Sequence, residues 1–172
     1  MQVLSPKIAL GIYSDCSATG VSVSLLKTDG LDILETPITL TRPYSIELKK
    51  QLLAIKKEDC SSLEIVKPIH EKITQEHITA AQELLNDNIR KIPHVDIGGY
   101  SGHLLHLHQA DRMDITLGSG KELARALQVP IVDRFTFTDL QAGGTGGPLL
   151  TTFMEVVMRD QKKPIGIISL GG

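Results

Sequence analysis

A glycine-rich segment late in the sequence has the residue types of a ligand-binding loop. Asp139 is followed by Gly143, Gly144, Thr145, Gly146 and Gly147, and then by Pro148. Glycines let a backbone approach a ligand closely, and proline suits the first turn of a helix, whose N-terminus attracts anions. The segment lacks the register of a dinucleotide fingerprint and the Lys-Ser/Thr pair of a P-loop. We therefore predict a ligand-binding loop of another kind.

A short hydroxyl-rich turn, Ser14–Gly20, is the second candidate. Its backbone N–H groups and hydroxyls would suit an anionic ligand, as they do in phosphate-binding loops. The same residues also suit a plain hairpin, in which Asp15, Ser17 and Thr19 cap their own backbone. The pattern alone favours the plain hairpin.

Three histidines, His103, His106 and His108, form the third candidate. His106 and His108 would share one face of a strand, and two imidazoles on one face can hold a metal ion. A third ligand at a suitable spacing is missing from the pattern, so solvated or hydrogen-bonded histidines are favoured. We predict no metal site.

The composition excludes several classes of function. The 172 residues are 41% hydrophobic and 22% charged, which is typical of one folded domain. The chain has eighteen basic and twenty acidic residues and therefore no excess of positive charge that would attract the phosphate backbone of a nucleic acid. Nucleic acid is not expected as a partner. No apolar run reaches the ~20 residues that span a bilayer. We expect a cytoplasmic protein with no membrane segment.

The elements that must position these residues alternate between strands and helices. Strands are expected over 7–13, 21–26, 31–40, 94–97, 104–107, 113–117, 129–132 and 165–170. Helices are expected over 45–55, 63–89, 121–127 and 149–158, and a loop over 139–147. The first three strands, joined by short turns, should pair antiparallel. The order predicts an α/β protein, a mixed sheet with helices on both faces, as in one lobe of actin-like and sugar-kinase-like ATPases.

Four motifs together resemble the anhydro-N-acetylmuramic acid kinases of peptidoglycan recycling. That family's M-S-G-T-S-L-D-G-V-D corresponds to residues 13–22, Y-S-D-C-S-A-T-G-V-S, and its I-G-S-H-G-Q-T-x-x-H to residues 97–106, I-G-G-Y-S-G-H-L-L-H. Its T-L-Q-I-G-D corresponds to D-I-T-L-G-S at 114–119. The most specific match sets I-P-V-V-x-D-F-R-x-x-D-x-x-x-G-G-Q-G-A-P-L-V against residues 129–150.

The resemblance implies a fold and a reaction. The fold is the N-terminal actin-like (ribonuclease H-like) lobe over residues 1–172, with the second lobe absent. The family's two lobes close on magnesium-ATP and the 1,6-anhydro sugar. An aspartate acts as general base on the water that attacks the anomeric carbon, and the sugar O6 takes the γ-phosphate, giving N-acetylmuramic acid 6-phosphate.

The resemblance also assigns roles to residues of this chain. Asp139 corresponds to the general base. The positions implied for ATP are Ser14, Asp15, Ser17, Thr19 and Gly20, and those implied for the amino sugar are His106, Gly143, Gly144, Thr145 and Gly146.

Several motif positions carry other residues in this chain. Two family aspartates fall on Thr19 and Ser22, and other polar or charged family residues fall on Tyr100, Gly102, Ser119, Arg134 and Thr136. Phosphoryl transfer depends on positioning and electrostatic stabilisation, so we expect little kinase activity from the chain alone.

Two arrangements follow from these expectations. In the first, a companion chain or a homodimer supplies the missing lobe, and an exposed apolar surface is then expected around 148–158 and 165–170. In the second, the lobe is a non-catalytic sugar-binding or scaffold protein.

Overall fold

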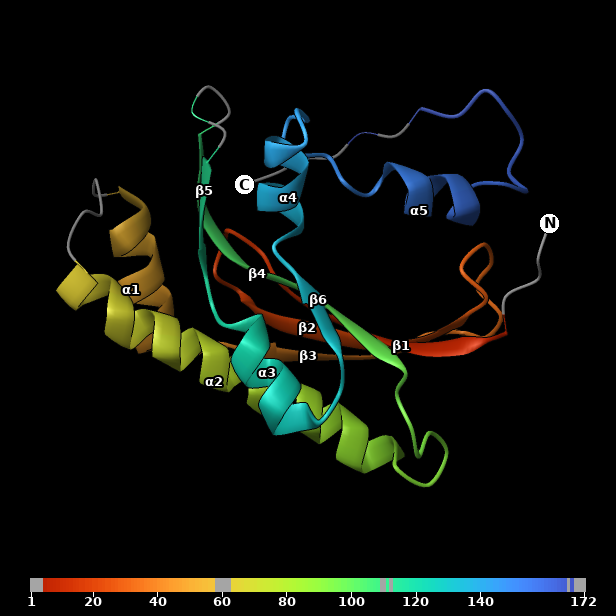
Figure 1. Cartoon of the computed structure of the whole chain (residues 1–172), viewed down its shortest axis with the longest axis horizontal. Coiled ribbons are helices and arrows are strands. Elements are labelled where there is room, and N and C mark those ends of the chain that lie inside the picture. Colours follow the sequence, from red (N-terminus) through yellow and green to blue (C-terminus); the bar gives the residue numbers. More distant parts are fainter. Residues whose placement is uncertain (1–4, 58–62, 109–110, 112, 167, 169–172) are drawn as a thin grey trace.

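The computed structural model describes residues 5–57, 63–108, 111, 113–166 and 168 of the chain. Figure 1 shows a sheet with α1, α2 and α3 on one side and α4 and α5 on the other. The helices are α1 (Ile46–Lys57), α2 (Leu63–Asn88), α3 (Gly120–Leu127), α4 (Phe135–Gln141) and α5 (Thr151–Val157). The strands are β1 (Lys7–Ser14), β2 (Gly20–Thr28), β3 (Ile38–Pro43), β4 (Ile97–His108), β5 (Met113–Leu117) and β6 (Ile131–Asp133).

The sheet is mixed, as the sequence predicts. Strands β3, β2 and β1 pair antiparallel, which confirms the meander expected at the start of the chain. Strand β4 pairs parallel to β1 on one edge. On its other edge, β4 pairs parallel to β6 and antiparallel to β5. Within the described ranges the chain therefore forms one α/β domain.

The core lies between the sheet and helices α1 and α2. Alternate residues of β1 and β2 face these helices, because side chains of a strand point to opposite faces in turn. Apolar residues of α2 recur every three or four positions and meet them there. Fully buried members of this core are Leu10, Ile12, Val21, Val23, Leu52, Ile73 and Ala80.

Several predicted boundaries are wrong, and each has a local cause. The third strand begins at Ile38 rather than at 31, because Pro37 has no N–H for the ladder. Before it, the carboxylate of Asp29 accepts N–H bonds from Leu31 and Asp32, which fixes a turn. The predicted strands 94–97 and 104–107 belong to one strand, β4, which runs through Gly98 and Gly99.

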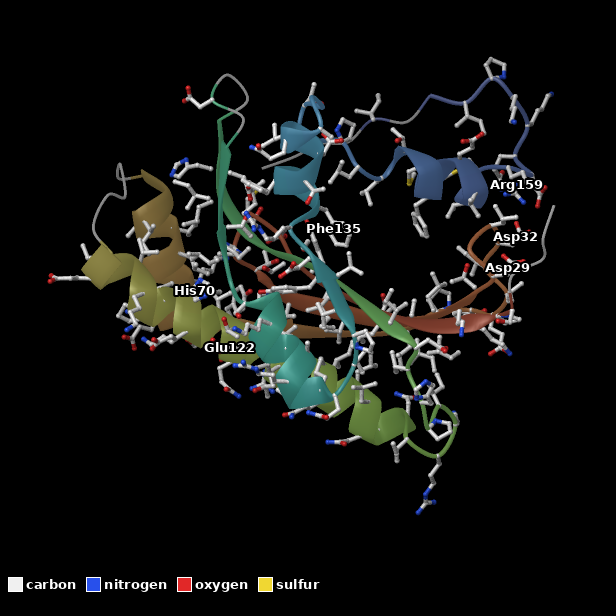
Figure 2. The ribbon with its side chains drawn as sticks, in the orientation of Figure 1. Asp29, Asp32, His70, Glu122, Phe135 and Arg159 are labelled. Carbon is white, nitrogen blue, oxygen red and sulfur yellow. The ribbon has the colours of Figure 1, made fainter. Side chains whose placement is uncertain are left out.

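The C-terminal part also differs from the prediction. Residues 135–141 form α4, so Asp139 lies in a helix and not in a loop. Helix α5 begins at Thr151, later than predicted. The predicted strand 165–170 falls largely outside the described residues, and 165, 166 and 168 are in no strand. Arg159, which follows α5, forms an ion pair with Asp32 and donates a hydrogen bond to the carbonyl of Leu31 at 3.3 Å. Figure 2 shows Arg159 and Asp32 side by side.

Candidate functional site

A cavity of about 410 Å³ lies where two strands end on the same edge of β4. Strand β6 pairs with β4 as far as Tyr100, and β5 pairs from His103 onward. Neither strand pairs with Ser101 or Gly102, which line the opening between them. Figure 2 shows His70 on α2 and Phe135 at the start of α4, two further residues of the lining. Open α/β sheets bind ligands where neighbouring strands diverge in this way.

The lining of the cavity includes side chains of both signs of charge. Two carboxylates, Asp114 and Asp133, and two cations, Lys121 and Arg134, face it. The guanidinium of Arg134 lies 4.0 Å from the centre of the Phe137 ring, a cation–π contact. A site of this kind suits a small polar ligand that carries hydroxyl groups and a charge.

Helix α2 holds the segment that joins β5 to α3, and this segment forms one wall of the cavity. The N–H of Gly118 donates to Nδ1 of His70 at 3.1 Å, and the N–H of Ser119 donates to Oγ1 of Thr74 at 3.2 Å. Ser119 then caps α3, accepting from the N–H of Glu122 at 3.2 Å. Because Nδ1 of His70 accepts, the neutral ring carries its proton on Nε2.

Gly118 is required in this wall. Its φ is +101°, a conformation that side chains rarely adopt. A Cβ at this position would lie 1.7 Å from the hydroxyl oxygen of Tyr100. Gly118 therefore lets the wall close over Tyr100, which is 2% exposed.

A buried hydrogen-bond network connects the cavity to the end of β1. The hydroxyl of Tyr100 is 3.2 Å from Nδ1 of His77, and Nε2 of His77 is 3.1 Å from Oγ of Ser14. The same oxygen of Ser14 is 3.1 Å from Nδ1 of His103. Tyr44 contributes a longer contact to His77, 3.4 Å from hydroxyl to Nε2. Polar groups inside the core thus join α2, β1 and β4 to Tyr44, the residue that follows β3.

Burial keeps His77, Tyr44 and Tyr100 neutral. It lowers the pKa of His77 to about 3, and the electrostatic interaction with His103 acts in the same direction. Burial also raises the pKa of Tyr44 and of Tyr100, and for Tyr100 the electrostatic interactions with Tyr44 and Asp133 add a smaller effect in the same direction. A neutral imidazole donates through one nitrogen and accepts through the other, so His77 serves partners on both sides.

The predicted phosphate turn, Ser14–Gly20, lies between β1 and β2. Oδ2 of Asp15 accepts the hydroxyl of Thr19 at 3.0 Å, and Oδ1 accepts the N–H of Thr19 at 3.3 Å. Ser17 lies within the turn, and Gly20 begins β2 opposite Pro43. These bonds are the self-capping that a plain hairpin requires. ATP binding by this turn stays a prediction.

Asp139 and the glycine-rich segment contact one another at the end of α4. Oδ2 of Asp139 accepts the N–H of Gly146 at 2.8 Å. A Cβ at Gly144 would lie 2.1 Å from the same oxygen, so only glycine lets the backbone pass the carboxylate. Thr145 bonds to the carbonyl of Gly147, and Gly143 has a φ of +97°. The structure brings Asp139 to this loop but does not place either in the lining of the cavity.

His106 lies in the part of β4 that pairs with β5, and its side chain is half-buried. It does not line the cavity. His103 is buried and bonded to Ser14, and the side chain of His108 lies outside the described residues. Among the described side chains, no group of three His, Cys, Asp or Glu residues is placed to hold a metal ion.

The cavity brings together several positions at which this chain lacks a polar or charged residue of the motifs quoted above. Five of them line it, namely Tyr100, Gly102, Ser119, Arg134 and Thr136. That these five share one site is not apparent from the motifs, which are separated in the sequence. Other lining residues, such as His70 and Asp114, gave no signal in the sequence because only the topology of the sheet brings them together.

Comparison with known proteins identifies relatives over nearly the whole chain. The model of the anhydro-N-acetylmuramic acid kinase family matches residues 7–172. The anhydro-N-acetylmuramic acid kinase of Rhodopseudomonas palustris is 29% identical over 95% of this chain and 47% of its own length. Those of Paramagnetospirillum magneticum and Azorhizobium caulinodans are 28% and 30% identical, over 96% and 95% of this chain and 45% and 46% of their own lengths. The chain spans about half the length of the curated relatives it matches.

Proposed function

This chain belongs to the anhydro-N-acetylmuramic acid kinase family, and we propose that it supplies the sugar-binding half of such a kinase. The reaction proposed is the ATP-dependent opening of 1,6-anhydro-N-acetylmuramic acid to N-acetylmuramic acid 6-phosphate, as in peptidoglycan recycling. The observation that carries the proposal is the family match over residues 7–172. The cavity beside β4, whose lining includes carboxylates, hydroxyl groups and aromatic rings, agrees with a sugar ligand.

Asp139 lies on α4, the helix whose first three residues line the cavity, and is the proposed general base; this role requires the sugar to extend from the cavity toward the end of α4. Water attacks the anomeric carbon of the sugar, its proton passes to the carboxylate of Asp139, and the bond from the anomeric carbon to O6 breaks. O6 then takes the γ-phosphate of ATP, and ADP leaves. One lone pair of Asp139 accepts the N–H of Gly146. A carboxylate has about four acceptor sites, so others remain for the proton of water.

Magnesium would reach the site with ATP. The described residues do not gather three His, Cys, Asp or Glu side chains that could hold the ion, so they fit a metal site of their own poorly. Magnesium bound to ATP usually keeps several waters and the phosphate oxygens as ligands.

We further propose that the other half of the kinase, which the matched region does not cover, docks on α5. Apolar side chains there are exposed, as the sequence predicts for a lobe with a companion. Leu150 is 65% exposed and Ile168 is 84% exposed. Both line a second cavity, of about 840 Å³, between α5 and the following segment. The partner supplies the rest of the nucleotide site, either as a further part of the same polypeptide, as a separate chain or as a second copy of this one.

No helix in the described part of the chain is long and apolar enough to cross a membrane. The amino sugar and ATP of the proposed reaction are both water-soluble, and a cytoplasmic location remains our expectation.

The direct test is a search for the product. The purified chain is incubated with magnesium-ATP and 1,6-anhydro-N-acetylmuramic acid, and the 6-phosphate is sought by mass spectrometry. A parallel sample adds the part of the Rhodopseudomonas palustris relative that lies outside the matched region. We expect product in the supplemented sample, and a loss of about a hundredfold or more in Asp139→Asn, because the general base is removed.

Asp87→Asn is the matched control, since Asp87 is exposed on α2, a different element from that of Asp139. Product that is unaffected by Asp139→Asn would contradict the role of Asp139. Absence of product from both samples would instead favour a non-catalytic sugar-binding or scaffold protein.

A further inference from the structure

Arg134 occupies an unusual backbone position at the rim of the cavity beside β4. Its φ is 59° and its ψ is 35°, the left-handed region, at the junction of β6 and α4. Residues other than glycine rarely adopt this conformation, and they keep it only where the surrounding structure fixes it. The turn brings the guanidinium onto the Phe137 ring, at 4.0 Å from its centre. The charge is therefore held in a fixed place on the cavity wall.

Neither of the two cations that line the cavity, Arg134 and Lys121, forms an ion pair within the described part of the protein, although two carboxylates share the lining. The ion pairs found there join other side chains. An arginine fixed by stacking keeps the edge of its guanidinium available for a planar oxyanion, which it binds with two parallel hydrogen bonds.

Asp133, the residue before Arg134, contributes a carboxylate to the lining of the same cavity. It pairs with Tyr100 across the sheet. A Cβ at Gly120 would lie 2.2 Å from its Oδ2, so the carboxylate packs directly on the first residue of α3. The carboxylate oxygens of Asp133 can accept hydrogen bonds from the hydroxyl groups of a sugar in the cavity.

We infer that Arg134 binds the carboxylate of an acidic sugar in this cavity, with Asp133 accepting its hydroxyl groups; this rests on the proposed function. In the motif quoted above, the aspartate and arginine fall on Arg134 and Thr136. Here an aspartate and an arginine stand at 133 and 134, and both line the same cavity. One charge of each sign is thus retained at displaced positions.

The test compares two sugars that differ in one group. N-acetylmuramic acid carries a lactyl carboxylate that N-acetylglucosamine lacks. Titration calorimetry on the full chain measures the binding of 1,6-anhydro-N-acetylmuramic acid, of 1,6-anhydro-N-acetylglucosamine and of ATP. The variant is Arg134→Gln, which removes no helix cap because the Arg134 side chain makes no capping bond. Arg90→Gln, at an exposed arginine remote from the cavity lining, is the control.

We expect the wild-type chain to bind the acidic sugar about tenfold or more tightly than the neutral one, as charged hydrogen bonds contribute. Arg134→Gln should remove this preference and leave the neutral sugar and ATP unchanged, while Arg90→Gln changes nothing. Melting temperatures confirm that both variants fold.

Four results would overturn the inference. Equal binding of both sugars by the wild-type chain would leave the proposed function standing but remove the carboxylate contact. A preference that survives in Arg134→Gln would exclude Arg134, and a loss confined to ATP would assign it to a phosphate. Binding of neither sugar would overturn the inference together with the sugar-binding role of this half.

Discussion

Nε2 of His77 lies 3.1 Å from Oγ of Ser14, and both side chains are buried. The contact joins the middle of α2 to the last residue of β1, 63 positions apart in the sequence. Ser14 also contacts His103. One hydroxyl therefore serves two imidazoles at the point where the predicted phosphate turn begins.

Ser14→Ala should destabilise the protein by about 1–3 kcal/mol, because two buried ring nitrogens lose a partner. Ser22→Ala is the matched control: Ser22 is an exposed serine of β2 with a hydroxyl contact to Thr41 at 3.2 Å. Its cost should stay within about 0.5 kcal/mol. Urea denaturation measures both, and equal costs for the two variants would contradict the account of the network.

His77 should make the protein sensitive to acid. Its pKa is about 3 when folded, against an ordinary value of 6.5. At a pH between 3 and 6.5, His77 is therefore protonated in the unfolded chain but not in the folded protein. The stability that depends on neutral His77 is fully present above pH 6.5 and falls as the pH drops toward 3.

The expected slope from this group is about 1.4 kcal/mol per pH unit within that window. His77→Gln keeps a donor and an acceptor but does not titrate, so its free energy of unfolding should fall less between pH 6.5 and 4. His94→Gln, at an exposed histidine, should follow the wild-type curve. Parallel curves for the wild type and His77→Gln would show that His77 is not held neutral.

Gly118→Ala tests the cavity wall. Gly118 and Gly143 both have a positive φ, of +101° and +97°. A Cβ at Gly143 has nothing within 4 Å, whereas one at Gly118 meets Tyr100. Gly143→Ala should cost about 1–2 kcal/mol for its backbone alone. Gly118→Ala should cost clearly more, and thermal unfolding of both variants gives the difference that belongs to the clash.

The regular parts of the fold could be predicted because their signals are local. Alternation of valine and serine predicts β2, and apolar spacing predicts α2. His77 is a polar residue within the apolar stripe of α2, and its partners on β1 and β4 are distant in sequence. Only the parallel pairing of β1 with β4 brings them together.

Helix α4 could not be predicted, for a physical reason. Its residues, FTFTDLQ, include β-branched and aromatic side chains that favour strands, and its first neighbour, Arg134, provides no cap. The helix forms because β6 ends at Asp133 and the chain turns through the left-handed Arg134.

The cavity could not be predicted either. The sequence predicts candidate sites at Ser14–Gly20 and in the loop after Asp139, because glycines and hydroxyl-bearing residues are clustered there along the chain. The cavity is instead lined by residues from several elements, among them α2, β4, β5 and β6. Examples are His70, Tyr100 and Asp133. Their proximity depends on two strands that end on one edge of β4.

The central claim is that this cavity holds the sugar. Titration of the labelled chain with 1,6-anhydro-N-acetylmuramic acid, followed by amide NMR, tests it most directly. We predict that the largest shifts fall on the amides of Gly118, Ser119, Gly120 and Arg134, which surround the cavity. Shifts confined to the Ser14–Gly20 turn or to α5, or no shifts at any sugar concentration, would contradict the claim.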